Sequence, residues 1–319
     1  MAMSAFNAPW SVVKNYTLAR EPLRSLINTV SFTTSAHGAV FEGLDILANS
    51  VSIVLNHRTI FRDCRIRFLM NAAVVGNAAS DGSEFNNCQI EYMVTPTPLN
   101  SLNAGWVAMS FTNADHVRIR NMSIKGSTAA VVLSGCTDFG ADQLRAENLL
   151  NAADGSRGNF LRATNCPGLE LGNFACINDL SNSYTGDLIW LSNCDGAHIY
   201  NGILDGNNAP TGAGIRLINS DTCLLENIDA IRMSDSAVDI DSGNHNHLFN
   251  VRTRSNNGVG TGGRAAPTGG GWAFRNAGLH TTYEQCVTYE LATPSNILDN
   301  TGSVQHQDIQ NKVFTVGVE

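Results

Sequence analysis

A short pattern recurs about ten times along the chain, and this repeat limits the possible folds more than any other feature. The pattern reads apolar-x-(Asn/Asp/Gly/Gln)-apolar-x-apolar, and successive copies begin 20 to 35 residues apart. The copies are FEGLDI at 41–46, FRDCRI at 61–66, FNNCQI at 85–90, IRNMSI at 119–124, ADQLRA at 141–146, LGNFAC at 171–176, IYNGIL at 199–204, LENIDA at 225–230, LFNVRT at 248–253 and YEQCVT at 283–288. Self-similarity at such a period indicates a solenoid.

A second pattern, apolar-x-apolar-x-(Asn/Gly/Ser), lies between the copies of the first. It occurs at 109–113, 131–135, 161–165, 189–193, 215–219, 238–242 and 272–276. Both patterns alternate with a period of two, as strands with one buried face do. Each repeat therefore predicts one coil of two or three short strands, which buries its apolar side chains only by stacking on neighbouring coils. The amide at the third position of the first pattern is expected to be buried and bonded to the amide of the next coil.

Together the patterns predict an all-β fold, a right-handed parallel β-helix solenoid of about ten coils. We expect an N-terminal cap or attachment segment over residues 1–38, the β-helix over 39–305, and a C-terminal tail or cap over 306–319.

The segment 17–30 predicts a helix that caps the open end of the first coil. Thr17 precedes Pro22, as at a helix start, and Leu23, Ile27 and Val30 then share one helical face.

Eight cysteines occur without any CxxC pair, which disfavours a zinc or redox motif. Cys64 and Cys88 share one inward slot of the repeat, and Cys136, Cys166 and Cys194 share another. We therefore expect free thiols that fill the core rather than disulfides, and neither a metal site nor a cofactor.

These motifs resemble the right-handed parallel β-helix superfamily, which includes pectate lyases, polygalacturonases, alginate epimerases and bacteriophage tailspikes. The resemblance covers residues 40–305 and is closest to tailspike-like virion proteins. It implies a fold, whereas the catalytic motifs of the family do not transfer. The stretch VDIDSGNHN at 238–246 lacks the Gly-His-Gly of polygalacturonases, and neither Arg-Ile-Lys nor the Asp-Pro-His of the epimerases occurs.

Outward positions of the second pattern place polar and aromatic side chains on successive coils. Trp190 offers an apolar platform for a sugar ring, and arginines bond hydroxyls or carboxylates in pairs. The predicted substrate-binding residues are Arg162, Trp190, Arg216, Arg275 and Arg232. The segments 91–105, 147–158, 178–187, 205–213 and 254–271 are expected to form loops on one side, either walling a groove or serving as plain surface insertions.

Asp239, Asp241 and Asp205 are the candidate catalytic residues. Asp239 and Asp241 stand two apart on one strand, roughly 6.5–7 Å between Cα atoms. That separation is near the range for an inverting glycosidase pair. A lyase would instead need a cation, for which Arg216 or Arg232 is available. A cross-coil ion pair between Arg216 and Asp239 with no catalytic role remains an alternative.

The formal net charge of −8, with only 20 Lys and Arg residues, argues against nucleic acid or an anionic membrane as a partner. No apolar run is long enough for membrane insertion, and the first residues lack a secretory signal.

We expect a virion-associated structural or adhesion protein, tailspike-like or a decoration protein, made in the cytoplasm and carried on the virion surface or another extracellular assembly. Its expected partners are other virion or assembly proteins, with host polysaccharide and a homotrimer as further candidates. A polysaccharide-degrading enzyme, hydrolase or lyase, and a pure scaffold are the alternatives.

Overall fold

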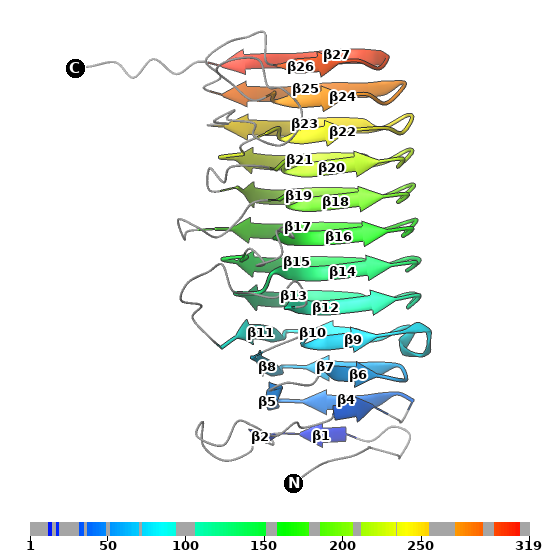
Figure 1. Cartoon of the computed structure of the whole chain (residues 1–319), viewed down its shortest axis with the longest axis vertical. Coiled ribbons are helices and arrows are strands. Elements are labelled where there is room, and N and C mark those ends of the chain that lie inside the picture. The colour runs from blue at the N-terminus through cyan, green and yellow to red at the C-terminus, as the bar shows by residue number, and fades with distance from the viewer. Residues whose placement is uncertain are drawn as a thin grey trace, which may run out of the picture.

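The computed structural model describes residues 12–14, 17–18, 32–34, 37–48, 52–69, 72–93, 106–150, 158–178, 186–206, 212–233, 235–254, 272–289 and 297–312. These residues form two parallel β-sheets whose strands stack coil upon coil along one axis (Figure 1). The expected right-handed parallel β-helix is confirmed, and the eleven rungs of the second sheet agree with the expected number of about ten coils.

The first sheet contains the copies of the first sequence pattern. Its main path runs through β1 (Val12–Lys14), β4 (Ala39–Glu42), β7 (Thr59–Arg62), β10 (Glu84–Asn86), β13 (Arg118–Lys125), β15 (Gly140–Glu147), β17 (Glu170–Ile177), β19 (His198–Asp205), β21 (Leu224–Ile231), β23 (His247–Arg254), β25 (Thr281–Tyr289) and β27 (Val304–Lys312). Four short strands extend the early coils: β2 (Thr17–Leu18), β5 (Asp45–Ala48), β8 (Arg65–Phe68) and β11 (Gln89–Tyr92).

The second sheet contains the copies of the second pattern. Its strands are β3 (Phe32–Thr34), β6 (Ile53–Leu55), β9 (Val74–Gly76), β12 (Val107–Thr112), β14 (Ala129–Ser134), β16 (Asn159–Thr164), β18 (Ile189–Ser192), β20 (Ile215–Ile218), β22 (Val238–Ile240), β24 (Phe274–Asn276) and β26 (Leu298–Asn300). Each pairs in parallel with the coils above and below, so residues at equivalent pattern positions stack in columns.

The third position of the first pattern is a bend with left-handed backbone. Its ten residues, from Gly43 to Gln285, have φ between 49° and 67°. Asn and Asp tolerate this conformation because their short side chains bond locally, which explains why amides recur there. The side chains stack as expected, with Asn121 donating to Asn87 at 2.9 Å and Asn250 donating to Asn227 at 2.7 Å. The expectation that they are buried is wrong, because they are exposed or half-buried on the outer surface. We call the column from Asp63 to Gln285 the amide ladder.

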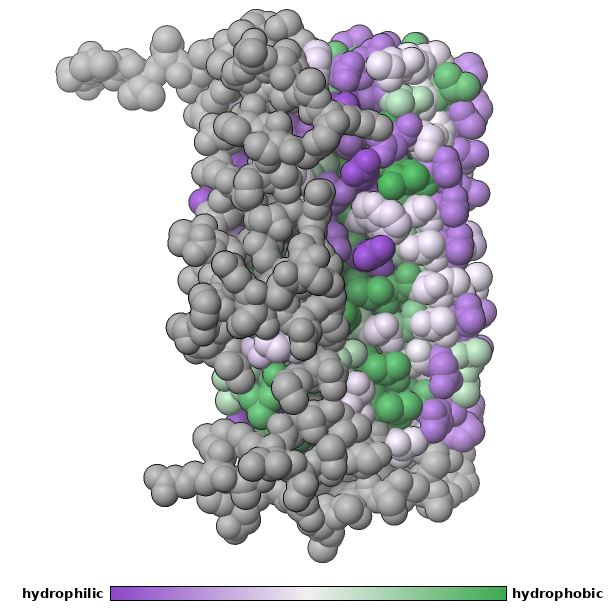
Figure 2. Space-filling model, in the orientation of Figure 1, coloured by the Kyte–Doolittle hydropathy of each residue, from purple (hydrophilic) through white to green (hydrophobic). Residues whose placement is uncertain are grey.

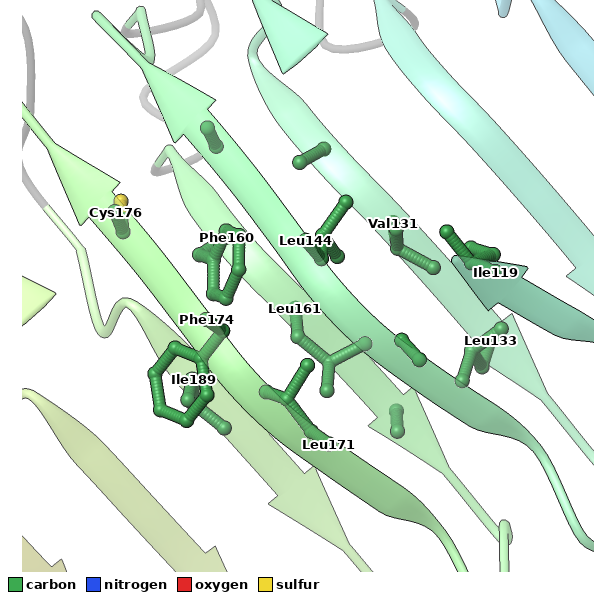
Figure 3. Packing of buried hydrophobic residues seen from close by; sticks show 14 of the residues in the cluster. Ile119, Val131, Leu133, Leu144, Phe160, Leu161, Leu171, Phe174, Cys176 and Ile189 are labelled. Carbon is green, nitrogen blue, oxygen red and sulfur yellow. The ribbon is translucent and has the colours of Figure 1, made fainter. Parts of the chain in front are cut away.

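The core lies between the sheets and is built from stacked columns. The rings of Phe41, Phe61 and Phe85 follow one another at 5.1 Å. In the middle coils, side chains such as Phe174 and Ile189 enter the same interior from opposite sheets (Figure 3). Gly202 is required here, since a Cβ at this position would lie 1.9 Å from Cζ of Phe174.

All eight cysteines are free and buried, which confirms the prediction of a thiol-filled core. The backbone nitrogen of Cys136 lies 3.4 Å from Sγ of Cys166 on the next coil, as expected for a stacked column.

The capping helix expected over 17–30 is not supported. Thr17 and Leu18 form strand β2 and pair with Asp45 and Ile46, and residues 19–31 lie outside the described part of the chain. Pairing with the next coil satisfies this backbone and outweighs the local helix signal. The described residues contain no α-helix, and none of their helical segments is long and apolar enough to cross a membrane.

Strands also occur outside the range 39–305 assigned to the β-helix. β1, β2 and β3 lie within 1–38 and pair with the first coils, and β27 runs across the junction between 305 and 306. The described solenoid therefore extends beyond both expected boundaries.

Candidate functional site

The second sheet brings four candidate residues into one outward column. Arg162 pairs in register with Trp190, Trp190 with Arg216, and Arg216 with Asp239. Arg275 follows next to Asp239, at the place where the sequence alignment put Ala273. The last copy of the pattern is therefore shifted by two residues, because Ala273 is buried and Arg275 points outward.

Arg162 and Trp190 form a cation–π pair at the N-terminal end of this column. The guanidinium carbon of Arg162 lies 4.9 Å from the ring centroid of Trp190. Arg162 is exposed and Trp190 is half-buried, so the pair is accessible from solvent. An indole with a guanidinium over it combines an apolar surface with several hydrogen-bond donors.

Arg216 is shared among three carboxylates. Its Nε donates to Oδ2 of Asp241 at 2.9 Å, and Nη2 contacts the same oxygen. Nη1 lies 3.5 Å from Oδ2 of Asp187, and Nε lies 4.0 Å from Oδ2 of Asp239. The closest partner of Arg216 is thus Asp241, one coil further on, and the expected ion pair with Asp239 is present at the longer distance.

Arg275 continues the network on the next coil. Its Nη1 lies 3.7 Å from Oδ1 of Asp235, and its Nε lies 3.6 Å from Oδ2 of Asp299. We call the two arginines and their carboxylates the Arg216–Arg275 cluster; the carboxylates are Asp187, Asp235, Asp239, Asp241 and Asp299. The cluster contains more acids than bases.

Asp239 is a buried acid of this cluster. Only 2% of the residue is exposed. Burial raises the pKa of Asp239, and the neighbouring Asp241 raises it further, while Arg275 and Arg216 act in the opposite direction. The outcome is a pKa of about 6, so the carboxyl holds its proton far more readily than an ordinary aspartate.

This arrangement can supply a proton donor beside a fixed carboxylate. Asp239 has the raised pKa of a general acid, and the guanidinium of Arg216 orients the carboxylate of Asp241. Because Asp239 is almost completely shielded from bulk water, it could transfer its proton only to a group bound directly against the cluster.

Two of the predicted residues are brought together elsewhere. Asp205 ends β19, and Arg232 follows β21 with a left-handed φ of 53°. Nε of Arg232 donates to Oδ1 of Asp205 at 2.8 Å, and Nη2 contacts the other oxygen. This bidentate pair joins neighbouring coils at the corner where the first-sheet strands end. These contacts clasp one coil to the next.

Sequence reasoning missed Asp187 and Asp299. Asp187 immediately precedes the buried pair Leu188 and Ile189, and its Oδ1 also accepts a bond from the backbone of Ala213 at 2.9 Å. The available signal for Asp187 was an acid two residues before a strand of the second pattern, whereas Asp299 lies within strand β26. The expected groove-walling loops fall mostly outside the described residues. Within the described part of the chain, no group of three or more His, Cys, Asp or Glu side chains is arranged so that it could hold a metal ion.

The surface changes character along the second sheet. In Figure 2, hydrophobic residues are most extensive over the lower and middle coils of the visible face, whereas hydrophilic residues lie over the upper coils and along the right-hand edge. The upper coils are the C-terminal ones, which contain the Arg216–Arg275 cluster (Figure 1).

The sequence matches no protein-family profile and no curated protein. Solved structures are similar in fold. The periplasmic alginate epimerase AlgG aligns with a TM-score of 0.57 and 9% identity, over 89% of this chain and 77% of that chain. The catalytic domain of a GH87 alpha-1,3-glucanase, solved with tetrasaccharides, aligns with a TM-score of 0.59 and 11% identity, over 87% and 53%. ORF18 of Geobacillus virus E2 aligns with a TM-score of 0.53 and 8% identity, over 88% and 54%.

At such low identity these likenesses show the fold alone. The chain spans about half of the glucanase domain and of the viral protein. The parallel β-helix expected from the repeat is the architecture that all three share with this chain, and two of the three act on or bind carbohydrate by their names.

Proposed function

We propose that the protein engages polysaccharide on the second-sheet face, between Arg162 and Arg275, as a particle-associated adhesion protein of the tailspike or decoration type. The observation that carries the proposal is the accessible Arg162–Trp190 pair, in register with the Arg216–Arg275 cluster. A flat apolar ring next to charged hydrogen-bonding groups suits a sugar, which has apolar ring faces and a rim of hydroxyls.

The charge of the cluster favours a neutral glycan over an acidic one. Five carboxyl groups surround two guanidiniums, and Arg216 already interacts with three of those carboxyls. A lyase needs a cation to neutralise a uronate, and Arg216 is poorly suited because its charge is compensated. Binding or hydrolysis of a neutral polysaccharide is therefore the better-supported chemistry.

Two observations support placement on a particle surface. Eight buried free thiols suit assembly in a reducing compartment, and a viral protein shares the fold. Other assembly proteins and a homotrimer stay the proposed partners, with the cytoplasm as the proposed place of synthesis.

Hydrolysis is the second candidate, and the raised pKa of Asp239 favours it. Asp239 would protonate the glycosidic oxygen as the bond to the anomeric carbon breaks. Asp241 would take a proton from the attacking water, which forms the new bond to that carbon. Both carboxyls exchange protons and return to their starting states after each turnover.

The test is affinity electrophoresis in gels containing dextran, laminarin or galactomannan as neutral glycans and alginate as the acidic one, with reducing ends assayed in parallel. We expect retardation by a neutral glycan, weakened about tenfold or more in Kd by Trp190→Ala. Tyr289→Ala is the matched control, because Arg254 lies 5.8 Å from the ring centroid of Tyr289 in a similar pair on the first sheet. Equal binding by Trp190→Ala and the unmodified protein would refute the proposed site.

A further inference from the structure

The opposite side of the molecule contains a polar hollow over strands β13 to β19. It has a volume of about 260 Å³, near the lower end of the roughly 300–1,000 Å³ typical of small-molecule sites. Its polar lining comes from Arg118, Arg120, Asp142, Glu170 and Tyr200.

Glycines at outward positions create this hollow. Gly140 forms part of its lining, where a Cβ would meet only the flexible side chain of Arg118 at 3.1 Å. Gly172 on the next coil supports the ring of Tyr200, since a Cβ there would lie 2.3 Å from Cζ of Tyr200. The ring of Tyr200 therefore leans from its own coil across the neighbouring strand.

Tyr200 is held in this position from two sides. Its hydroxyl donates to Oε1 of Glu170 at 3.0 Å, and its ring centroid lies 4.5 Å from that of His198. An aromatic ring fixed in advance loses little conformational freedom when a ligand packs on it.

A second hollow adjoins the first across the amide ladder. It has a volume of about 500 Å³, and its polar lining includes Arg65, Asn87, Asn121, Gln143 and Arg145. The two hollows share strands β13 and β15, where Arg120 precedes Asn121 and Asp142 precedes Gln143.

The ladder amides have hydrogen-bonding capacity beyond their contacts with one another. A side-chain amide offers two donor hydrogens and an oxygen with two lone pairs. Asn121 uses one donor on Asn87, and Asn87 uses one donor on Asp63. The exposed amides can therefore bond hydroxyls of a ligand without breaking the ladder.

The charge and polarity of the surface indicate the ligand class. Arg118 and Arg120 are balanced by Asp142 and Glu170, so the first hollow favours neither anions nor cations. Protein-binding surfaces are usually apolar at their centre. The two large hydrophobic residues identified as exposed in the described chain, Ile203 and Leu279, line neither hollow.

We propose that the two hollows together form a second carbohydrate-binding site, specific for a neutral glycan that packs on Tyr200 and crosses the amide ladder. It is independent of the second-sheet site. Two sites on opposite sheets would let one molecule engage two glycan segments and so bind a polymer more tightly than either site alone.

The test uses the full chain carrying Trp190→Ala, so that the second-sheet site does not contribute. Binding of dextran, laminarin and galactomannan is measured by affinity electrophoresis, before and after adding Tyr200→Ala or Gly140→Leu. Tyr200→Ala removes the ring, and Gly140→Leu fills the hollow. We expect each to weaken the Kd for the bound glycan about tenfold or more, as loss of a central aromatic contact does. Tyr289→Ala, further along the first sheet, should leave it unchanged.

The outcomes separate the two sites. The second site is overturned if Trp190→Ala alone binds none of the glycans, or if Tyr200→Ala and Gly140→Leu bind as well as their parent. The second-sheet proposal fails instead if Trp190→Ala has no effect and Tyr200→Ala abolishes binding in the otherwise unmodified chain. Circular dichroism shows whether each variant folds. If Gly140→Leu does not fold, Tyr200→Ala alone tests the second site.

Discussion

The two sheets use the same coil geometry in opposite ways. Along the first sheet, the third position repeats one backbone conformation and nearly one residue type, from Asp63 to Gln285, on the exposed surface. Along the second sheet, the outward column changes residue type at every coil from Arg162 to Arg275, and its one carboxylate, Asp239, is withdrawn from solvent.

This difference separates two kinds of constraint. A repeated residue satisfies a requirement that every coil shares, such as a left-handed bend. A residue that appears once in a column, and is buried and charged, satisfies no general requirement of the solenoid and incurs a desolvation penalty. The Arg216–Arg275 cluster is therefore the part of the structure that the fold itself explains least.

The largest expected effect is on catalysis, if the second-sheet cluster hydrolyses glycans. Asp239→Asn should lower the rate of cleavage by about 10²- to 10⁴-fold, because an amide cannot donate the required proton. The assay is the release of reducing ends from a glycan that the protein cleaves. Asn227→Gly, in a part of the ladder that lines neither hollow, is the comparison and should leave the rate unchanged.

Cleavage that persists in Asp239→Asn would remove the catalytic role of this carboxyl. The cluster would then be a binding or structural feature only.

The next effect is on stability, and it compares buried with exposed ion pairs. Arg216→Ala leaves Asp241 and Asp187 without their guanidinium, and we expect a loss of about 3 kcal/mol in the free energy of unfolding. Arg65→Ala removes the exposed pair with Glu91 and should cost less than about 1 kcal/mol. Urea unfolding followed by circular dichroism measures both. Similar losses of unfolding free energy in the two variants would show that the ion pairs of the cluster contribute no more to stability than an exposed pair.

The pH dependence of stability sharpens the comparison further. The folded state holds the proton of Asp239 more tightly than the unfolded state, so this carboxyl lowers stability as pH rises from about 4 to 6. A rise in pKa from the ordinary 3.8 to about 6 corresponds to about 3 kcal/mol. Urea unfolding across this range should show the unmodified protein losing stability relative to Asp239→Asn. Parallel curves for the two proteins would show that Asp239 titrates normally.

The smallest effect concerns the ladder. Asn173 has a φ of 50°, and Asn173→Ala should cost roughly 1–2 kcal/mol because alanine keeps the Cβ that strains the left-handed backbone but loses the short polar side chain that offsets this strain. Asn173→Gly loses the same side-chain bonds without that strain and serves as the matched variant. Comparing the thermal unfolding of Asn173→Ala and Asn173→Gly isolates the cost of the left-handed backbone conformation. If both variants are equally unstable, the ladder bonds and not the conformation explain why amides recur.

The sequence alone determined the architecture and the contents of each column. Period-two alternation and a recurring third-position amide follow from requirements inside one coil, so local patterns were enough to predict the strands, the thiol-filled core and the register of Arg162, Trp190, Arg216 and Asp239. These properties depend on residues close together in the chain.

Only the tertiary structure decided which residues from different coils come together and whether each side chain faces the core or the solvent. It moved Arg275 into register with Asp239, added Asp187 and Asp299 to the cluster, placed the amide ladder outside rather than inside, and formed strand β2 where a helix was expected. Pairing between coils joins segments that lie far apart in the sequence, and burial depends on contacts with other coils. Neither the pairing between coils nor the burial of a side chain can be predicted from a local pattern. The chemistry of both faces therefore appears only once the coils are stacked.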